Sequence, residues 1–155
     1  MKILYICTHN RCRSILCEAM TNSFNSNIEA RSAGSQPVGE VHPLSLKYLA
    51  ARGVDTQGLK SQSWDEFEDY NADLVVTVCD SAAGETCPVF FGRSLKVHWG
   101  LEDPSKHEGT DQEKADAFNR TIDIIEKRVA ALAELAEKQL DNAGLKAALL
   151  TLGAK

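Results

Sequence analysis

Residues 2–14 read KILYICTHNRCRS, and this stretch decides the fold. Residues 2–6 form a short apolar run, which predicts a buried strand. Residues 7–13 contain no apolar run and predict a loop. From Ser14 onward the apolar residues recur at intervals of three and four, which predicts a helix with Ser14 near its cap. The stretch therefore predicts a strand–loop–helix unit at the beginning of the chain.

The remainder of the chain continues this alternation of strands and helices. Further strands are predicted at residues 28–34, 73–79 and 94–99, the last of them near an edge. Further helices are predicted at residues 43–53, at residues 63–70, and from the capping box Thr110-x-x-Glu113 to about residue 136. The alternation predicts an α/β fold with a four-stranded parallel sheet and helices on both faces. We expect one domain over residues 1–139 and a tail at residues 140–155 that is helical or frayed.

Length and charge limit the function classes. The chain has 155 residues and a net charge of −5, which argues against a nucleic-acid binder. Residues 1–60 carry seven Lys/Arg against four Asp/Glu, whereas residues 61–155 carry ten against eighteen. The local positive excess predicts an anion site near the N-terminus. No apolar run is long enough to span a membrane and the first residues do not form a secretory signal, so we expect a cytoplasmic location.

The chain has an odd number of cysteines, namely Cys7, Cys12, Cys17, Cys79 and Cys87. An odd count without a signal peptide does not describe a secreted disulfide framework. Zinc is a poor interpretation, because no two of these cysteines have the short spacing of zinc ligands. We therefore expect no metal site built from cysteine, and thiols that are either buried and inert or used in chemistry.

Cys7, Arg13 and Ser14 form a Cys-x5-Arg-Ser motif between the first strand and the first helix. The backbone N–H groups of such a loop can point inward at an anion, and the following helix adds its positive end. Arginine grips two oxygens at once, and a positive environment favours the reactive thiolate of a cysteine. The alternative without a catalytic site is a buried cysteine followed by an unrelated arginine. The strand–loop–helix context favours an oxyanion cradle with Cys7 as nucleophile.

The position of this motif resembles the low-molecular-weight tyrosine phosphatase superfamily, in which an Asp-Pro pair lies far downstream. Asp103-Pro104 matches that pair, and the resemblance implies that Asp103 donates a proton to the leaving oxygen. A turn aspartate before proline is the plainer alternative. Cys79 follows the strongest predicted strand and Cys87 lies eight residues later, before Pro88. This pair is similar to the one in the thioredoxin-coupled arsenate reductases of the same superfamily. The alternative is that both cysteines are buried and have no catalytic role, which would give the same sequence pattern.

The resemblance implies a three-cysteine relay. Cys7 attacks arsenate, Cys79 forms a disulfide with Cys7 and releases arsenite, and Cys87 then takes over the disulfide. A thioredoxin-type reductant, or glutathione with glutaredoxin, recycles the protein, which holds no bound cofactor. Phosphate and sulfate are expected to compete with arsenate, and weak phosphatase activity is an expected by-product.

The resemblance also implies supporting roles in and around the loop. Oxyanion binding and support of the loop are expected from Thr8, His9, Asn10, Arg11, Cys12 and Ser14. Cys17 is more simply a packing residue, and a solvent-exposed His9 is the plainer interpretation of that residue. In some relatives a potassium ion binds beside the loop, and Asn10, Glu18 and Ser32 match three of its ligands. The fourth position falls on Ser63, which is not an acid, so we predict no tight potassium site.

Two other functions fit parts of the pattern. A tyrosine phosphatase would share the cradle, but Ser105, Lys106 and His107 follow Asp103-Pro104 where such enzymes place aromatic residues that hold a phenyl ring. A non-catalytic thiol or arsenite sensor would need neither Arg13 nor Asp103. We expect a monomer that binds no nucleic acid and no membrane.

Overall fold

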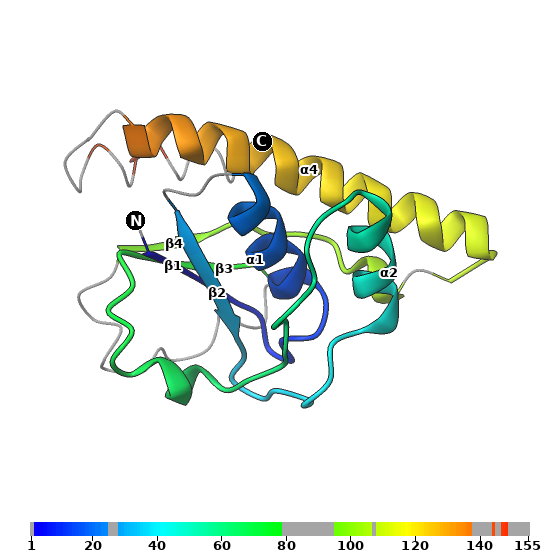
Figure 1. Cartoon of the computed structure of the whole chain (residues 1–155), viewed down its shortest axis with the longest axis horizontal. Coiled ribbons are helices and arrows are strands. Elements are labelled where there is room, and N and C mark those ends of the chain that lie inside the picture. Colours follow the sequence, from blue (N-terminus) through cyan, green and yellow to red (C-terminus); the bar gives the residue numbers. More distant parts are fainter. Residues whose placement is uncertain are drawn as a thin grey trace.

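The computed structural model describes residues 2–24, 28–78, 95–106 and 108–137, together with residues 144, 147 and 148 (Figure 1). Its elements follow in the order β1 (Lys2–Ile6), α1 (Arg13–Phe24), β2 (Glu29–Ala33), α2 (Pro43–Ala51), η1 (Trp64–Phe67), β3 (Leu74–Thr77), β4 (Leu95–His98), η3 (Pro104–Lys106) and α4 (Asp111–Glu137). The tail expected at residues 140–155 lies almost wholly outside the described residues.

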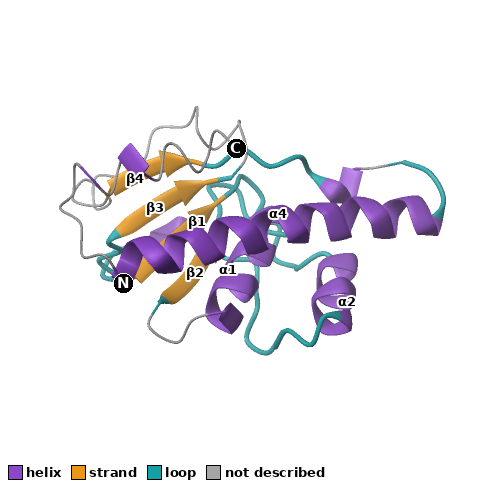
Figure 2. Ribbon diagram, turned by 90° about the horizontal axis from the view of Figure 1, so that it is seen from above, coloured by secondary structure: helices purple, strands orange, loops and turns teal. Residues whose placement is uncertain are grey.

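The four strands form one sheet in the order β2-β1-β3-β4, and every neighbouring pair is parallel. The predicted α/β class with a four-stranded parallel sheet is confirmed, and β4 lies at an edge as expected. β1 is central, and its residues from Ile3 to Ile6 are buried. Because the strands are parallel, their carboxyl ends lie at one edge of the sheet, where the loops after β1 and β4 begin (Figure 2).

The helix α1 packs against β1 and β2 and also contacts α4 (Figure 1). Its residues from Ser14 to Thr21 are all buried, because the sheet and α4 enclose this part of the helix. The predicted long helix is confirmed as α4, which buries an apolar stripe formed by Phe118, Ile122, Ile125, Val129 and Leu132. The beginning of α1, and with it Arg13, is thus fixed by packing on two sides.

Local sequence signals explain the helix ends. Glu113 N donates to Thr110 Oγ1 at 3.2 Å, which is the serine/threonine half of the predicted capping box, at the beginning of α4. Gly53, just beyond α2, has φ +76°, a conformation that suits glycine. The helix predicted at residues 63–70 is shorter than expected. It is the 3-10 turn η1, which ends at Phe67, and the rings of Phe67 and Tyr70 contact each other edge to face just beyond it.

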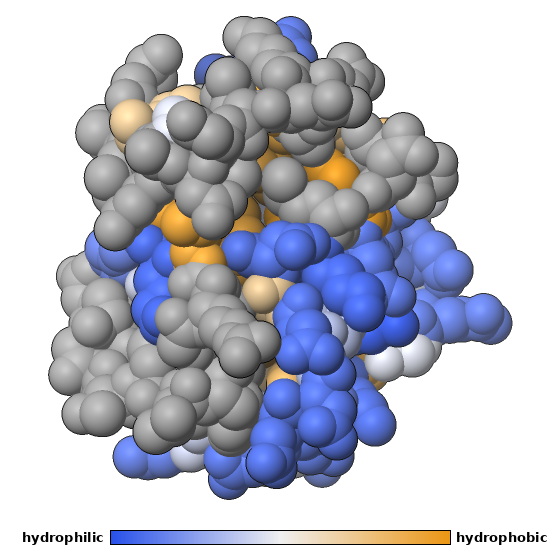
Figure 3. All heavy atoms as spheres, turned by 90° about the vertical axis from the view of Figure 1, so that its left-hand side faces the viewer, coloured by the Kyte–Doolittle hydropathy of each residue, from blue (hydrophilic) through white to orange (hydrophobic). Residues whose placement is uncertain are grey.

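On the face shown in Figure 3, hydrophilic side chains cover much of the described surface, and apolar side chains are visible beside them over a smaller area. The large apolar side chains that are exposed among the described residues are Phe24, Val38 and Ile124. Within the described ranges, no helix combines the length and the apolar character needed to cross a bilayer.

Candidate active site

Cys7 lies directly after β1, at the carboxyl edge of the sheet, and is 4% exposed. Its N–H donates to Ala33 O at 3.3 Å, which continues the pairing of β1 with β2. Its Sγ lies 2.9 Å from Ser14 Oγ in the first turn of α1. The strand therefore delivers the thiol to the beginning of the helix, as the sequence predicted.

Asn10 is the centre of the loop's internal hydrogen bonds. It has φ +47°, a left-handed conformation that asparagine tolerates better than most residues, and its side chain is fully buried. Its Oδ1 accepts from Gln62 N at 2.8 Å, and its Nδ2 donates to Ser14 Oγ at 2.8 Å and to Ser32 Oγ at 3.0 Å. Because Ser14 Oγ accepts from Asn10, its own hydrogen is available to Cys7 Sγ. This direction of hydrogen bonding suits a thiolate.

The same network continues to Glu18, since Ser32 Oγ donates to Glu18 Oε1 at 2.5 Å. Burial raises the pKa of the Glu18 carboxyl, and the hydrogen bond from Ser32 opposes that shift. Asn10, Ser32 and Glu18, which match three potassium ligands of some relatives, are thus joined to one another. Ser63 Oγ accepts from Asp65 N at the cap of η1. The prediction that potassium does not bind tightly stays a prediction.

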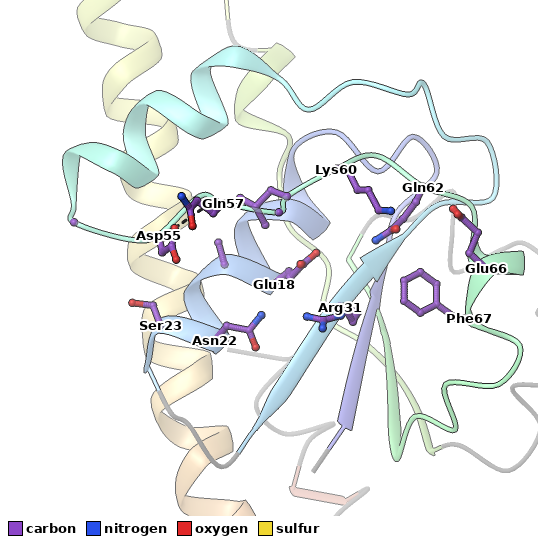
Figure 4. Close-up of a pocket in the computed structure, with 14 residues that line it drawn as sticks. Glu18, Asn22, Ser23, Arg31, Asp55, Gln57, Lys60, Gln62, Glu66 and Phe67 are labelled. Carbon is purple, nitrogen blue, oxygen red and sulfur yellow. Dashed lines mark hydrogen bonds between the residues drawn. The ribbon is translucent and has the colours of Figure 1, made fainter.

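A polar cleft of about 790 Å³ lies beyond this network, between α1, β2 and residues 53–67 (Figure 4). Glu18 and Arg31 reach this cleft from α1 and β2, and Lys60 reaches it from the loop before η1. The cleft is lined by neither Cys7 nor Arg13, so it is separate from the cradle.

The carbonyl groups of the loop are held by neighbouring segments. Thr8 O accepts from Gln36 N at 2.9 Å, His9 O accepts from Val38 N at 3.2 Å, and Arg11 O accepts from His42 N at 2.9 Å. In a planar trans peptide the N–H of the next residue points away from the carbonyl. The N–H groups that follow these carbonyls therefore point away from the supporting segments, as an oxyanion cradle requires.

Gly34, which directly follows β2, lies so close to the loop that there is no room for a side chain. A Cβ at this position would lie 2.5 Å from Thr8 O and 2.9 Å from Cys7 O, both of which are backbone atoms. The close approach of these backbones fixes where the cradle sits on the sheet. Sequence reasoning placed Gly34 only at the end of a strand and missed this role.

Gly34→Ala is expected to destabilise the protein by about 1–3 kcal/mol and to weaken phosphate binding, because the Cys7–Thr8 backbone must move. Urea unfolding and the inhibition constant of phosphate measure the two effects. Ser35→Ala is the matched control, since that position already carries a Cβ. Unchanged phosphate binding in Gly34→Ala would contradict the role of Gly34 in fixing the position of the Cys7–Thr8 backbone.

Arg13 and Asp103 meet at the mouth of the loop, although they lie far apart in the sequence. Arg13 Nη2 lies 3.6 Å from Asp103 Oδ2, and the two side chains are 19% and 16% exposed. Arg13 Nη1 donates to Leu101 O at 3.1 Å. The structure thus brings Cys7, Arg13, Ser14 and Asp103 to one edge of the sheet, as predicted.

The segment that carries Asp103 continues from β4 and stays attached to β3. Trp99 N donates to Thr77 O at 2.8 Å, and Leu101 N donates to Val78 O at 3.1 Å. The Trp99 side chain is buried beneath the site, with its ring centroid 6.4 Å from that of Tyr5. This segment also contains the 3-10 turn η3. Its Ser105 donates to Asp103 through both N and Oγ, which the sequence analysis did not anticipate.

The other predicted loop residues differ in exposure. His9 is exposed, with Nδ1 3.2 Å from Gln36 O, and Thr8 and Arg11 are half-buried. Cys12 is buried, and burial raises the pKa of its thiol to about 12. Burial likewise raises the pKa of the Cys17 thiol. Both thiols therefore stay protonated at neutral pH and are poor nucleophiles. Cys79 and Cys87 lie outside the described residues, so the second half of the predicted relay stays a prediction.

His42 is a supporting residue that sequence reasoning missed, because an N-cap histidine carries no distinctive pattern. Its backbone N–H donates to Arg11 O. Its ring Nδ1 accepts from Leu44 N at 3.1 Å at the beginning of α2. Burial and the nearby Arg11 charge lower the pKa of His42. Protonation would remove the acceptor and place a positive charge at a helix N-terminus.

The free energy of unfolding is expected to depend on pH through His42. The folded protein binds this proton less readily than the unfolded chain, so the stabilising contribution is complete above about pH 6.5 and is lost as the pH falls below it. His42→Asn keeps a capping acceptor that does not titrate, whereas His42→Ala loses about 1 kcal/mol at about pH 8. Urea unfolding between about pH 5 and 8 measures the slope. An equal slope in wild type and His42→Asn would contradict this assignment.

Comparison with known proteins places these features in a family. The family model for low molecular weight phosphotyrosine protein phosphatase matches residues 2–144. A protein of Halalkalibacterium halodurans named arsenate reductase is 38% identical over 133 residues, which cover 85% of this chain and 94% of that protein.

Solved structures agree with this result. The arsenate reductase of Archaeoglobus fulgidus is 28% identical, with a TM-score of 0.68 over 82% of this chain and 94% of that one. A thioredoxin-dependent arsenate reductase of Corynebacterium glutamicum is 29% identical, with a TM-score of 0.60 over 83% of this chain and 61% of that one. With a family model matched over nearly its whole length, this chain belongs to the low molecular weight phosphotyrosine protein phosphatase family.

Proposed function

We propose that this protein is an arsenate reductase that works through a three-cysteine relay. The observation that carries the proposal is the 38% identity to a protein named arsenate reductase over 94% of that protein. The convergence of Cys7, Arg13 and Asp103 at one edge of the sheet supports it, because arsenate has the shape and charge of phosphate. Phosphate and sulfate are competing anions in this proposal.

The first half of the reaction uses the described site. The Cys7 thiolate, which accepts a hydrogen bond from Ser14, attacks the arsenic atom and forms a sulfur–arsenic bond. Arg13 and the loop N–H groups hold the remaining oxygens. Asp103 gives its proton to the departing oxygen, which leaves as water. Thr8, His9, Asn10, Arg11 and Cys12 contribute the backbone of the cradle.

The second half transfers two electrons. The Cys79 thiolate attacks Cys7 Sγ, a disulfide forms between them, and the electron pair of the sulfur–arsenic bond goes to arsenic, which leaves as arsenite. Cys87 then attacks Cys79, so that the disulfide moves to Cys79–Cys87 and Cys7 is free again. The dithiol of a thioredoxin reduces this disulfide, with glutathione and glutaredoxin as the alternative source of electrons. The similarity to a thioredoxin-dependent arsenate reductase supports thioredoxin as the source of electrons.

The remaining features of the proposal concern the whole protein. Residues 1–139 form the reductase domain, and residues 140–155 follow it as a C-terminal tail. The protein acts as a cytoplasmic monomer without a bound cofactor, and it hydrolyses aryl phosphates slowly because the cradle also accepts phosphate.

A coupled assay tests the proposal. The protein is mixed with arsenate, thioredoxin, thioredoxin reductase and NADPH, and the loss of NADPH is followed; a second arm replaces the thioredoxin system by glutathione, glutaredoxin and glutathione reductase. We expect arsenate-dependent loss of NADPH in the thioredoxin arm. Turnover only in the glutaredoxin arm would support arsenate reduction but would replace thioredoxin by glutaredoxin as the reductant. No arsenate-dependent loss of NADPH in either arm would overturn the proposal.

A further inference from the structure

Ser105 binds one oxygen of the Asp103 carboxyl twice. Asp103 Oδ1 accepts from Ser105 N at 2.9 Å and from Ser105 Oγ at 2.6 Å. Both donors belong to the short turn η3, which begins at Pro104, and Pro104 is buried. The turn is therefore anchored, and it presents two donors to the same atom.

The second oxygen of Asp103 has a different neighbour. Oδ2 lies 3.6 Å from Arg13 Nη2, on the side of the carboxyl that faces the cradle. Arg13 is itself fixed by its hydrogen bond to Leu101 O, and Leu101 N is bound to Val78 O at the end of β3. The two oxygens of one carboxyl group are thus held in distinct and defined environments.

We propose that Ser105 is a positioning residue that keeps the transferable proton of Asp103 on Oδ2. A carboxyl oxygen that accepts two hydrogen bonds has no lone pair left for a proton, so the proton binds the other oxygen. Oδ2 is also the oxygen beside Arg13, which holds the oxyanion. The inference rests on the proposed function, because it concerns the proton that Asp103 gives to the departing oxygen.

Protonation of Oδ2 has a second consequence for Arg13. A neutral Asp103 no longer forms an ion pair with Nη2, so this nitrogen is available to the anion. Without the Ser105 hydroxyl, one lone pair of Oδ1 is open and the proton can reside on the oxygen that faces away from the cradle. The expected result is slower protonation of the leaving group with little change in anion binding.

The test compares Ser105→Ala with Ser105→Thr, which keeps a hydroxyl at the same position. Ser105→Ala is expected to lower kcat for arsenate about tenfold, with KM and the inhibition constant of phosphate unchanged. The same variant should slow phenyl phosphate, whose leaving group needs a proton, more than 4-nitrophenyl phosphate, whose leaving group does not. Ser105→Thr should restore both rates.

A second background separates positioning from a general structural effect. In Asp103→Asn no carboxyl proton exists, so adding Ser105→Ala should cause no further loss of kcat. Wild-type rates in Ser105→Ala, or an equal loss in the Asp103→Asn background, would overturn the inference. A wild-type protein that hydrolyses aryl phosphates but does not reduce arsenate would overturn the proposed function instead, and the pair of aryl phosphates would still test Ser105.

Discussion

Cys7→Ser is expected to lower arsenate reduction by more than about 10³-fold, while phosphate still binds to the protein. Serine has nearly the shape of cysteine and keeps a polar atom next to Ser14 Oγ, so the loop stays folded. A serine hydroxyl cannot form the sulfur–arsenic bond. It also cannot be oxidised to a disulfide, so it cannot supply the electrons that reduce arsenate. The measurement combines arsenite formation with phosphate binding by calorimetry.

Cys17→Ala is the matched control for this experiment. Cys17 is also a buried cysteine close to the loop, but burial raises the pKa of its thiol and α4 encloses it. We expect this variant to reduce arsenate at the wild-type rate. Arsenite formation by Cys7→Ser within about tenfold of wild type would contradict the assignment of Cys7 as nucleophile.

Arg13→Lys is expected to lower kcat/KM for arsenate by about 10²-fold or more, although the positive charge is kept. Lysine cannot bind two oxygens in the parallel manner of a guanidinium. Lysine also has a single nitrogen, whereas Arg13 contacts Leu101 O through Nη1 and Asp103 through Nη2. Both the binding of the anion and the placement of the segment that carries Asp103 are therefore weakened. Steady-state kinetics with arsenate, and with phosphate as inhibitor, measure the effect.

Arg52→Lys is the control for the loss of a guanidinium elsewhere. Arg52 binds Asp123 at 2.8 Å and binds Asn119 through Nε and Nη2, and it joins the end of α2 to α4. We expect a small loss of stability and no change in KM for arsenate. If Arg13→Lys kept kcat/KM within about threefold of wild type, this result would contradict the assignment of Arg13 as a bidentate ligand of the anion.

The strand–loop–helix unit around Cys7 could be predicted because its signals are local. The apolar run of β1, the polar loop and the helical spacing after Ser14 follow one another in a single stretch, and the capping box at Thr110 is equally local. The placement of Arg13 and Asp103 at one edge of the sheet follows from the predicted parallel strands, whose carboxyl ends lie together, whereas the direct contact between the two side chains is visible only in the structure.

Other parts of the site could not be predicted, because their partners are distant in sequence and are backbone groups. Gln62 N sets the orientation of the Asn10 amide, and because the Asn10 amide then donates to Ser14 Oγ, the Ser14 hydroxyl hydrogen is available to Cys7 Sγ. Any residue except proline could supply such an N–H, so no side-chain pattern marks it. Ser105 is different: a serine after Asp-Pro is a common turn signal, and its second role emerges only from the distances to Oδ1.

A single turnover without any reductant tests the relay most directly. Fully reduced protein is mixed with excess arsenate, arsenite is quantified by arsenic speciation, and the disulfides are mapped by mass spectrometry after alkylation and digestion. Wild type should release about one arsenite per chain and finish with a Cys79–Cys87 disulfide, whereas Cys87→Ser should stop at Cys7–Cys79. Arsenite release with Cys79 and Cys87 both still reduced would contradict the relay.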